Sequence, residues 1–303
     1  MHAPLPPHAT GHAWRTENHL RPGPRNLVAS MDIVGRAALL GLRVGNAVSR
    51  WLTRTPANGL VPTTHRYSSS TVQAHVLLQH LEARREVFTD AFVHDLARAY
   101  MADPREGYGR KARRLLARVA EGASWRRAAR RGSQSAAAGL EAASRAPIVG
   151  AFFHDDLDQV ALQAGRATRV THGEDDGIAG AVAVATTAAL FARDAVSPST
   201  VWRQLLARTP MGAVRRRIRV ASRLGEAVEP ADAASMLLRD GGTADGIAFA
   251  TWCAVRHPDD YAVAVQAATA AGDQATPIGA IVGGVVGVRA WPPTPWVRAT
   301  ESL

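Results

Sequence analysis

The chain has 303 residues, of which 47% are hydrophobic, so it can bury one large core and has the composition of an ordinary globular protein. Aromatic residues make up only 6%, and the abundance of alanine favours closely packed helices over a β-sheet. The net charge of +10 comes almost entirely from arginine, because Lys111 is the only lysine.

The arginines are spread along the chain and are not gathered into a basic tail. We therefore favour GC-rich coding over a nucleic-acid-binding surface as their origin. Two runs keep the nucleic-acid alternative open: Arg215, Arg216, Arg217 and Arg219, and Arg113, Arg114, Arg126, Arg127, Arg130 and Arg131. On helices, such runs usually form solvated faces whose apolar stems pack against the protein.

Cellular location is addressed by three features of the sequence. Cys253 is the only cysteine, which excludes an intramolecular disulfide, and its apolar surroundings predict a buried thiol. No stretch has the length and apolarity expected of a membrane span, and residues 1–30 lack the continuous apolar segment of a secretory signal. We therefore expect a cytoplasmic protein with no membrane partner.

In chain order, residues 1–30 contain five prolines and no periodicity, which predicts a disordered tail. The ordered domain is expected over residues 31–290, and Met31 is a second candidate for the translation start, testable by N-terminal sequencing of the native protein. Helical periodicity predicts helices over residues 32–51, 71–85, 89–100, 110–121, 156–169, 175–193, 199–208, 230–238, 245–256, 258–271 and 278–289. Thr89, Ser199 and Asp245 are predicted N-caps, and residues 291–303, with three prolines, a surface tail.

Candidate functional residues lie in five regions at the ends of predicted helices. These are the segment RAALLGLRVGNAVS (36–49), YSSSTVQAHVLLQHL (67–81), Gly107–Gly109 with GLEAASRAPIVG (139–150), the Thr171-His172 pair before an alanine-rich helix, and AGDQAT (271–276) before a glycine-rich helix. There is no Walker A loop, no GxGxxG after a strand, no HExxH and no nucleophile elbow.

Taken in this order, the five regions resemble the ADP-ribosylglycohydrolase family. The resemblance covers most of residues 32–290 and implies an all-α fold, an orthogonal multi-helix bundle of the ADP-ribosylglycohydrolase type with its site at converging helix ends. It also implies hydrolysis of an N- or O-glycosidic bond to ADP-ribose, assisted by two Mg²⁺ ions. The residues that it implies for ligand binding are Asn46, Ser68, Ser69, Ser70, Tyr108, Gly109, Arg145, His172, Gly272, Asp273 and Thr276.

The family pattern is altered at its acidic positions. Ser69 and Ser70 replace both aspartates of Thr-Asp-Asp-Thr, Asn46 replaces the aspartate of Gly-Asp-Ala, and Ala275 replaces the second aspartate of Gly-Gly-Asp-Thr-Asp-Thr. Only Asp273 keeps its carboxylate. Because two neighbouring Mg²⁺ ions require several anionic oxygen ligands, we expect no binuclear site. At most one weakly bound Mg²⁺ is expected, with Asp273, Thr276 and Ser68 as its ligands.

Three functions remain open at this stage. We favour an inactive family member that binds ADP-ribose, a nucleotide or an ADP-ribosylated protein. The second is a hydrolase with an altered, metal-poor mechanism, in which Asp273, Glu141 or Glu174 would act as base. The third is a structural or nucleic-acid-associated protein. His172 is expected to form hydrogen bonds between helices, and the acidic residues at 155–158 and 174–176 are expected to favour helix starts.

Overall fold

The computed structural model describes residues 27–54, 64–129, 138–194 and 197–303, and most of these residues are helical. The predicted all-α class is therefore confirmed, since β structure in the described ranges amounts to one isolated bridge between His65 and Thr300. The helices are α1 (Leu27–Arg54), α2 (Ser69–Arg84), α3 (Thr89–Ala102), α4 (Arg110–Ala120), α5 (Trp125–Ala129), α6 (Ala138–Ala143), α7 (Ala146–Phe152), α8 (Leu157–Arg169), α9 (Asp175–Ala192), α10 (Pro198–Arg208), α11 (Ala213–Ala221), α12 (Pro230–Leu237), α13 (Thr243–Arg256), α14 (Tyr261–Ala268), the 3₁₀ helix η2 (Thr269–Gln274), α15 (Ala275–Val286) and α16 (Thr294–Ala299).

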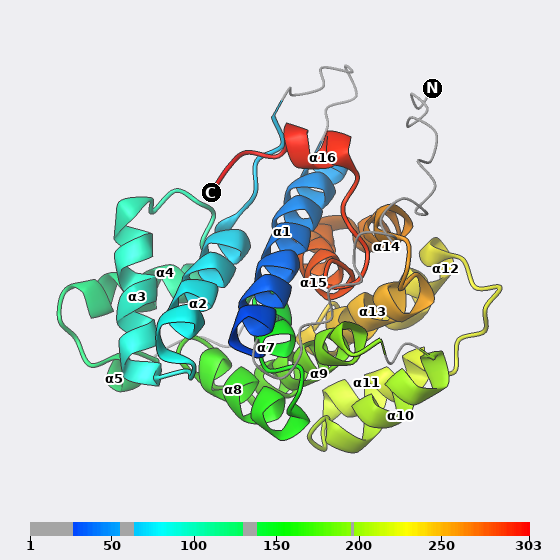
Figure 1. Ribbon diagram of the computed structural model, residues 1–303, viewed down its shortest axis with the longest axis horizontal. Helices are drawn as coiled ribbons and strands as arrows, with labels where there is room; N and C mark the ends of the chain where they lie inside the picture. Colours follow the sequence, from blue (N-terminus) through cyan, green and yellow to red (C-terminus); the bar gives the residue numbers. More distant parts are fainter. Residues whose placement is uncertain (1–26, 55–63, 130–137, 195–196) are drawn as a thin grey trace.

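The long first helix, α1, packs along α15 through the middle of the molecule (Figure 1). Glycines on both helices let the two backbones approach closely. A Cβ added at Gly41 would lie 2.3 Å from the carbonyl oxygen of Gly283, and one added at Gly45 would lie 2.4 Å from that of Gly279. Tyr261 donates a hydrogen bond to the carbonyl of Gly41 at this contact. Only glycine fits at such positions without moving a helix.

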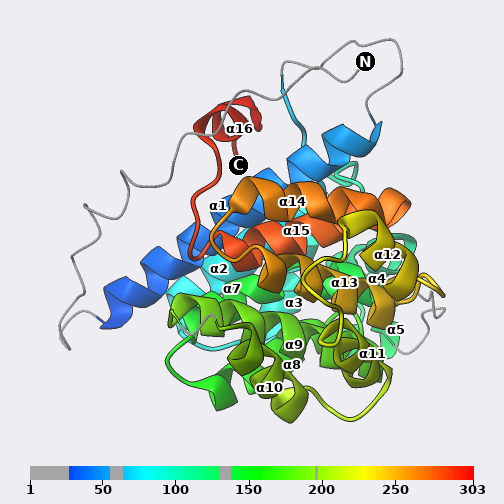
Figure 2. The same cartoon turned by 90° about the vertical axis from the view of Figure 1, so that its right-hand side faces the viewer.

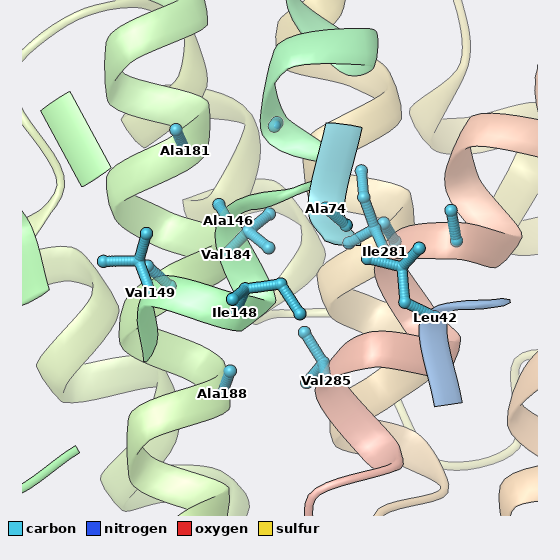
Figure 3. Close-up of a cluster of buried hydrophobic side chains, with 14 of the residues drawn as sticks. Leu42, Ala74, Ala146, Ile148, Val149, Ala181, Val184, Ala188, Ile281 and Val285 are labelled. Atoms are coloured by element: carbon cyan, nitrogen blue, oxygen red, sulfur yellow. The ribbon is translucent and has the colours of Figure 1, made fainter. Parts of the chain in front are cut away.

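The remaining helices form two groups on either side of this centre (Figures 1 and 2). Helices α2 to α5 lie on one side, and α10 to α13 on the other, with α9 packed against α7, α8, α6 and α13 between them. A cluster of small and branched side chains from α1, α2, α7, α9 and α15 fills the space where these helices meet (Figure 3). Alanine and valine dominate the cluster, so the helices pack closely, as the composition predicts.

Some helix boundaries differ from the predictions. Five helices were not predicted, namely α5, α6, α7, α11 and α16. The predicted caps are wrong by one to three positions: Phe88 precedes α3, Ser197 caps α10 by accepting from the N–H of Thr200, and Gly242 precedes α13. Asp245 instead accepts from the N–H of Asp240 and pairs with Arg217 at 2.6 Å. Only at α10 does a neighbouring side chain, that of Ser197, take over the predicted capping role, whereas Phe88 and Gly242 form no side-chain capping bond.

Both ends of the chain are more structured than predicted where the structure describes them. Helix α1 begins at Leu27, inside the predicted tail, and residues 1–26 lie outside the described residues. The predicted C-terminal tail contains α16, whose Trp296 packs edge-on against Tyr261. After α16, Thr300 bridges to His65, and Glu301 accepts a hydrogen bond from the backbone N–H of Tyr67. This segment therefore holds the chain that leads into α2.

Helix α9 meets the length and composition of a membrane-spanning segment, so the prediction that no stretch would do so is wrong for this helix. However, 78% of its apolar window is buried inside the protein, as in the core helix of a soluble protein. Cys253 is fully buried in α13, as predicted. Asp156 caps α8 through bonds from the N–H groups of Asp158 and Gln159, which confirms the capping interpretation of that acidic cluster.

Candidate ligand-binding site

Asn46 of α1 joins the starts of α2 and α15 at one edge of the candidate site. Its buried side chain accepts hydrogen bonds through Oδ1 from the backbone N–H of Ser68 (2.7 Å), the Ser68 hydroxyl (3.1 Å) and the Thr71 hydroxyl (3.3 Å). Through Nδ2 it donates to the carbonyl of Thr276 (3.1 Å). A carboxylate could accept the first three bonds but has no proton for Thr276. The predicted residues Asn46, Ser68 and Thr276 therefore lie together, in a network that an amide satisfies.

Glu141 places a carboxylate beside the buried serines at the start of α2. Its Oε1 accepts a hydrogen bond from the backbone N–H of Gly109 (2.9 Å), and its carboxylate also accepts one from the Ser69 side chain. A Cβ at Gly109 would lie 2.4 Å from the other carboxylate oxygen. Burial raises the pKa of Glu141, while the Gly109 N–H, the charge of Arg145 and the Ser69 bond oppose this rise.

The loop before α4 carries Tyr108, which lies buried against Tyr100 with the rings edge-on and 5.2 Å between centroids. The Tyr108 hydroxyl is also buried, and it has no hydrogen-bond partner among the described residues. Burial raises the pKa of Tyr108, so the phenol keeps its proton and remains a possible donor. Nearby, the backbone N–H of Ser69 donates to the carbonyl of Glu106 (2.7 Å), which fixes this loop against α2.

Arg145 lies fully buried beneath these residues and connects α2, α8 and the segment before α9. It donates to Gln73 Oε1, to the carbonyl of Ala167 and to the hydroxyl of Thr171, each at 2.7 Å. Burial lowers the pKa of Arg145 to about 10, although the nearby Glu141 carboxylate acts in the opposite direction. The guanidinium stays charged at neutral pH. Arg145 therefore has a structural function, whether or not a ligand also contacts it.

His172 presents a buried N–H group without a protein partner. Its Nδ1 lies 2.9 Å from the Thr171 hydroxyl, which already accepts a bond from Arg145. The Thr171 hydroxyl can then donate its hydrogen bond to Nδ1, which leaves the ring proton of the neutral imidazole on Nε2. Nε2 is buried and has no hydrogen-bond partner among the described residues. Burial, together with the charges of Arg145 and Lys111, lowers the pKa of His172 to about 3, so the ring is neutral.

Lys111 and Glu174 form an ion pair between α4 and the start of α9. Burial favours the protonated carboxyl, but the hydrogen bond and charge of Lys111 outweigh it and lower the pKa of Glu174. The second oxygen, Oε2, is buried and has no hydrogen-bond partner in the described ranges. Glu174 precedes the first turn of α9, and Asp175 and Asp176 lie in that turn, as predicted for acids at a helix start.

Asp273 differs from these buried groups because it lies at the protein surface. It follows Gly272, whose φ of +57° suits glycine, at the turn between η2 and α15. Asp273 is exposed, and within the described residues its carboxylate forms no hydrogen bond or ion pair. Among all the residues that the structure describes, no group of three or more His, Cys, Asp and Glu side chains could hold a metal ion.

The comparisons with known proteins agree with this architecture. The family model for ADP-ribosylglycohydrolase matches residues 34–301. The chain belongs to the ADP-ribosylglycohydrolase family. It is also similar to a solved structure described as an "ADP-ribosylglycohydrolase-related protein complex", with a TM-score of 0.65 and 22% sequence identity over 90% of this chain and 94% of that chain. At that identity, the likeness shows the shared fold alone. No curated protein matches the chain.

Within the ADP-ribosylglycohydrolase family pattern, Glu141 is the residue that sequence reasoning undervalued. In the resemblance, residues 139–141 take the place of a Gly-Asn-Gly motif, so Glu141 stands where the second glycine would be, and the sequence suggested it only as a possible base. A charged residue where the family pattern has a glycine was the sequence signal that could have identified Glu141 as a site residue. Its side chain now fills space beside Gly109 that a glycine would leave open. The sequence also gave no sign that Arg145, Thr171 and His172 form one hydrogen-bonded chain.

Proposed function

We propose that this member of the ADP-ribosylglycohydrolase family binds ADP-ribose, free or attached to a protein, without a binuclear magnesium site and without efficient hydrolysis. A nucleotide that shares the pyrophosphate and ribose is the wider ligand class. The observation that carries the proposal is the buried, unpartnered Nε2–H of the neutral His172. A buried donor of this kind costs free energy unless a ligand or water accepts its hydrogen bond.

The donor atoms argue against two magnesium ions. Ser69 and Ser70 are neutral, the side chain of Ala275 has no oxygen, and Asn46 is already bound to Ser68 and Thr276. Mg²⁺ prefers octahedral oxygen ligands and usually carboxylates, and neighbouring dications need anionic ligands to offset their repulsion. These residues do not fit a binuclear centre. Asp273, with the oxygens of Thr276 and Ser68, supports at most one weakly bound ion.

Buried polar atoms that lack a hydrogen-bond partner among the described residues suit the polar parts of a nucleotide sugar. The unpartnered hydroxyl of Tyr108 and the Nε2–H of His172 can donate hydrogen bonds, and Glu174 Oε2 can accept one from a ribose hydroxyl. Lys111 adds a positive charge at the start of α4. Fewer carboxylates make the site less anionic, which reduces repulsion of a pyrophosphate that has no metal beside it.

Isothermal titration calorimetry with ADP-ribose, with and without Mg²⁺, tests the proposal. We expect binding that Mg²⁺ does not change. His172→Ala should weaken it about tenfold or more, because a buried hydrogen bond to the ligand is lost. Asp273→Asn is the matched control at the family's metal position and should bind normally. Absence of binding in both conditions would refute the proposal, and binding that requires Mg²⁺ would show that a metal site has survived.

A hydrolase with an altered mechanism is the second candidate, because the buried Glu141 carboxyl has a raised pKa that suits proton transfer. Incubation with an ADP-ribosylated peptide, followed by chromatography of released ADP-ribose, distinguishes the two functions. Turnover by the wild-type chain that Glu141→Gln abolishes would favour the hydrolase. Binding of ADP-ribose without its release from the peptide would favour the binding protein.

A further inference from the structure

The exposed face of α4 concentrates positive charge that the described protein does not neutralise. Arg110, Arg113, Arg114 and Arg118 are all exposed, while Ala112, Leu115, Leu116 and Val119 on the same helix are buried. The last three arginines follow Arg110 by three, four and eight positions, and this spacing places all four on one side of a helix. None of the four forms an ion pair within the residues that the structure describes.

Folding alone does not account for these positions. Arg110 and Arg113 lie in the first turn of α4, where the positive end of the helix dipole disfavours cations, and no acidic residue is present in that turn. Like charges four positions apart, as in Arg110–Arg114 and Arg114–Arg118, also destabilise a helix. Biased coding can supply arginine codons, but this arrangement is electrostatically unfavourable in the free protein. It becomes favourable when an external polyanion binds.

Helix α11 has a similar composition but uses its charges differently. Arg217 pairs with the buried Asp245 and donates to the carbonyl of Leu237, and Arg215 contacts the sulfur of Met211. Part of the α11 run is therefore committed within the fold, whereas the α4 face is not. In Figure 1, α4 lies to the left and α11 to the right of the central pair of helices α1 and α15.

We propose that the exposed face of α4, formed by Arg110, Arg113, Arg114 and Arg118, binds the phosphate backbone of a nucleic acid. Phosphates along a strand repeat regularly, and guanidinium groups bind them through paired N–H donors. Arg127 on the neighbouring α5 is also exposed and extends the positive surface, while Arg126 is held by Asp90. Arg130 and Arg131 lie outside the described residues.

Fluorescence anisotropy with a labelled DNA duplex and a labelled single-stranded RNA tests the proposal and separates the two sources of phosphate. Four phosphate contacts predict a slope of log affinity against log salt of about −3.6 for duplex DNA, or roughly a 150-fold loss between about 50 and 200 mM salt. The triple variant R113Q/R114Q/R118Q should reduce the magnitude of that slope by about 2.7. R113K/R114K/R118K should largely preserve the slope, because it keeps the charge.

The matched control removes the same charge elsewhere. R216Q/R219Q/R223Q changes three exposed arginines at α11 for which the described residues offer no ion pair, and it should bind nucleic acid as the wild type does. All substituted side chains are exposed, so no variant should melt below the wild-type temperature. R113Q/R114Q/R118Q should melt slightly above it, because the repulsion between arginines on α4 is removed. If both glutamine variants weakened nucleic-acid binding equally, the effect would come from net charge alone, and the proposal would be overturned. Absence of binding at low salt, or binding only to anionic lipid vesicles, would overturn it as well.

Discussion

The close contact between α1 and α15 yields a quantitative prediction for Gly41→Ala. The added Cβ would lie 2.3 Å from the carbonyl oxygen of Gly283, so the contact must lengthen by about 1 Å to reach the ordinary 3.4 Å. Overpacking of this kind costs about 1–3 kcal/mol, and weakening the Tyr261 hydrogen bond to the Gly41 carbonyl adds about 1 kcal/mol. Replacing glycine in a helix returns about 1 kcal/mol. The net loss is about 2 kcal/mol.

Thermal and urea unfolding followed by circular dichroism measure this loss. A chain of this size should melt roughly 4–8 °C lower for about 2 kcal/mol. Gly165→Ala on α8 is the control, because the nearest atom to its new Cβ is 3.8 Å away. That variant should be as stable as the wild type or about 0.5–1 kcal/mol more stable. If Gly41→Ala matched the control, the helix contact would not be as close as described and the argument would fail.

Three further predictions concern the buried polar groups. The lowered pKa of His172 makes the protein less stable as pH falls below about 6.5 toward 3, by roughly 3 kcal/mol at pH 4.5. His172→Asn should flatten that part of the stability–pH curve measured by urea unfolding. Arg145→Met should lower the free energy of unfolding by about 3–5 kcal/mol, because three buried acceptors lose their donor, and a variant as stable as wild type would contradict this. The raised pKa of Glu141 means that its ionisation destabilises the fold as pH rises, so Glu141→Gln should gain stability over wild type at pH 8 but not at pH 4.

The sequence predicted most long helices because their apolar periodicity is strong, as in α1 and α8. It failed for short helices such as α7, whose seven residues are all buried and show no polar face to mark a period. It also misplaced caps, because Ser197 and Ser199 are equally good candidates and only the backbone path selects one. The local sequence therefore predicts that a segment is helical, whereas the residues at which the helix begins and ends depend on tertiary contacts.

The candidate site was predicted less completely. The link from Asn46 to Ser68 and Thr276 joins segments that the family pattern had already paired. The position of Glu141 against Gly109 depends on a side chain reaching across 32 residues of sequence, which no local pattern encodes. Likewise, the tautomer of His172 follows from its neighbours in space and not from its place in the sequence.

The pairing of α1 with α15 also bears on how the chain acquires its structure during synthesis. The first helix emerges from the ribosome with its glycine-lined face exposed, and the helix that covers this face is made only after most of the chain has followed. Contacts between such distant segments form late and slow folding. Until α15 arrives, α1 has α2 and α7 as its available neighbours. The nascent chain is therefore most exposed to misassembly along this one surface, and a chaperone that shields α1 would act at the step where protection matters most.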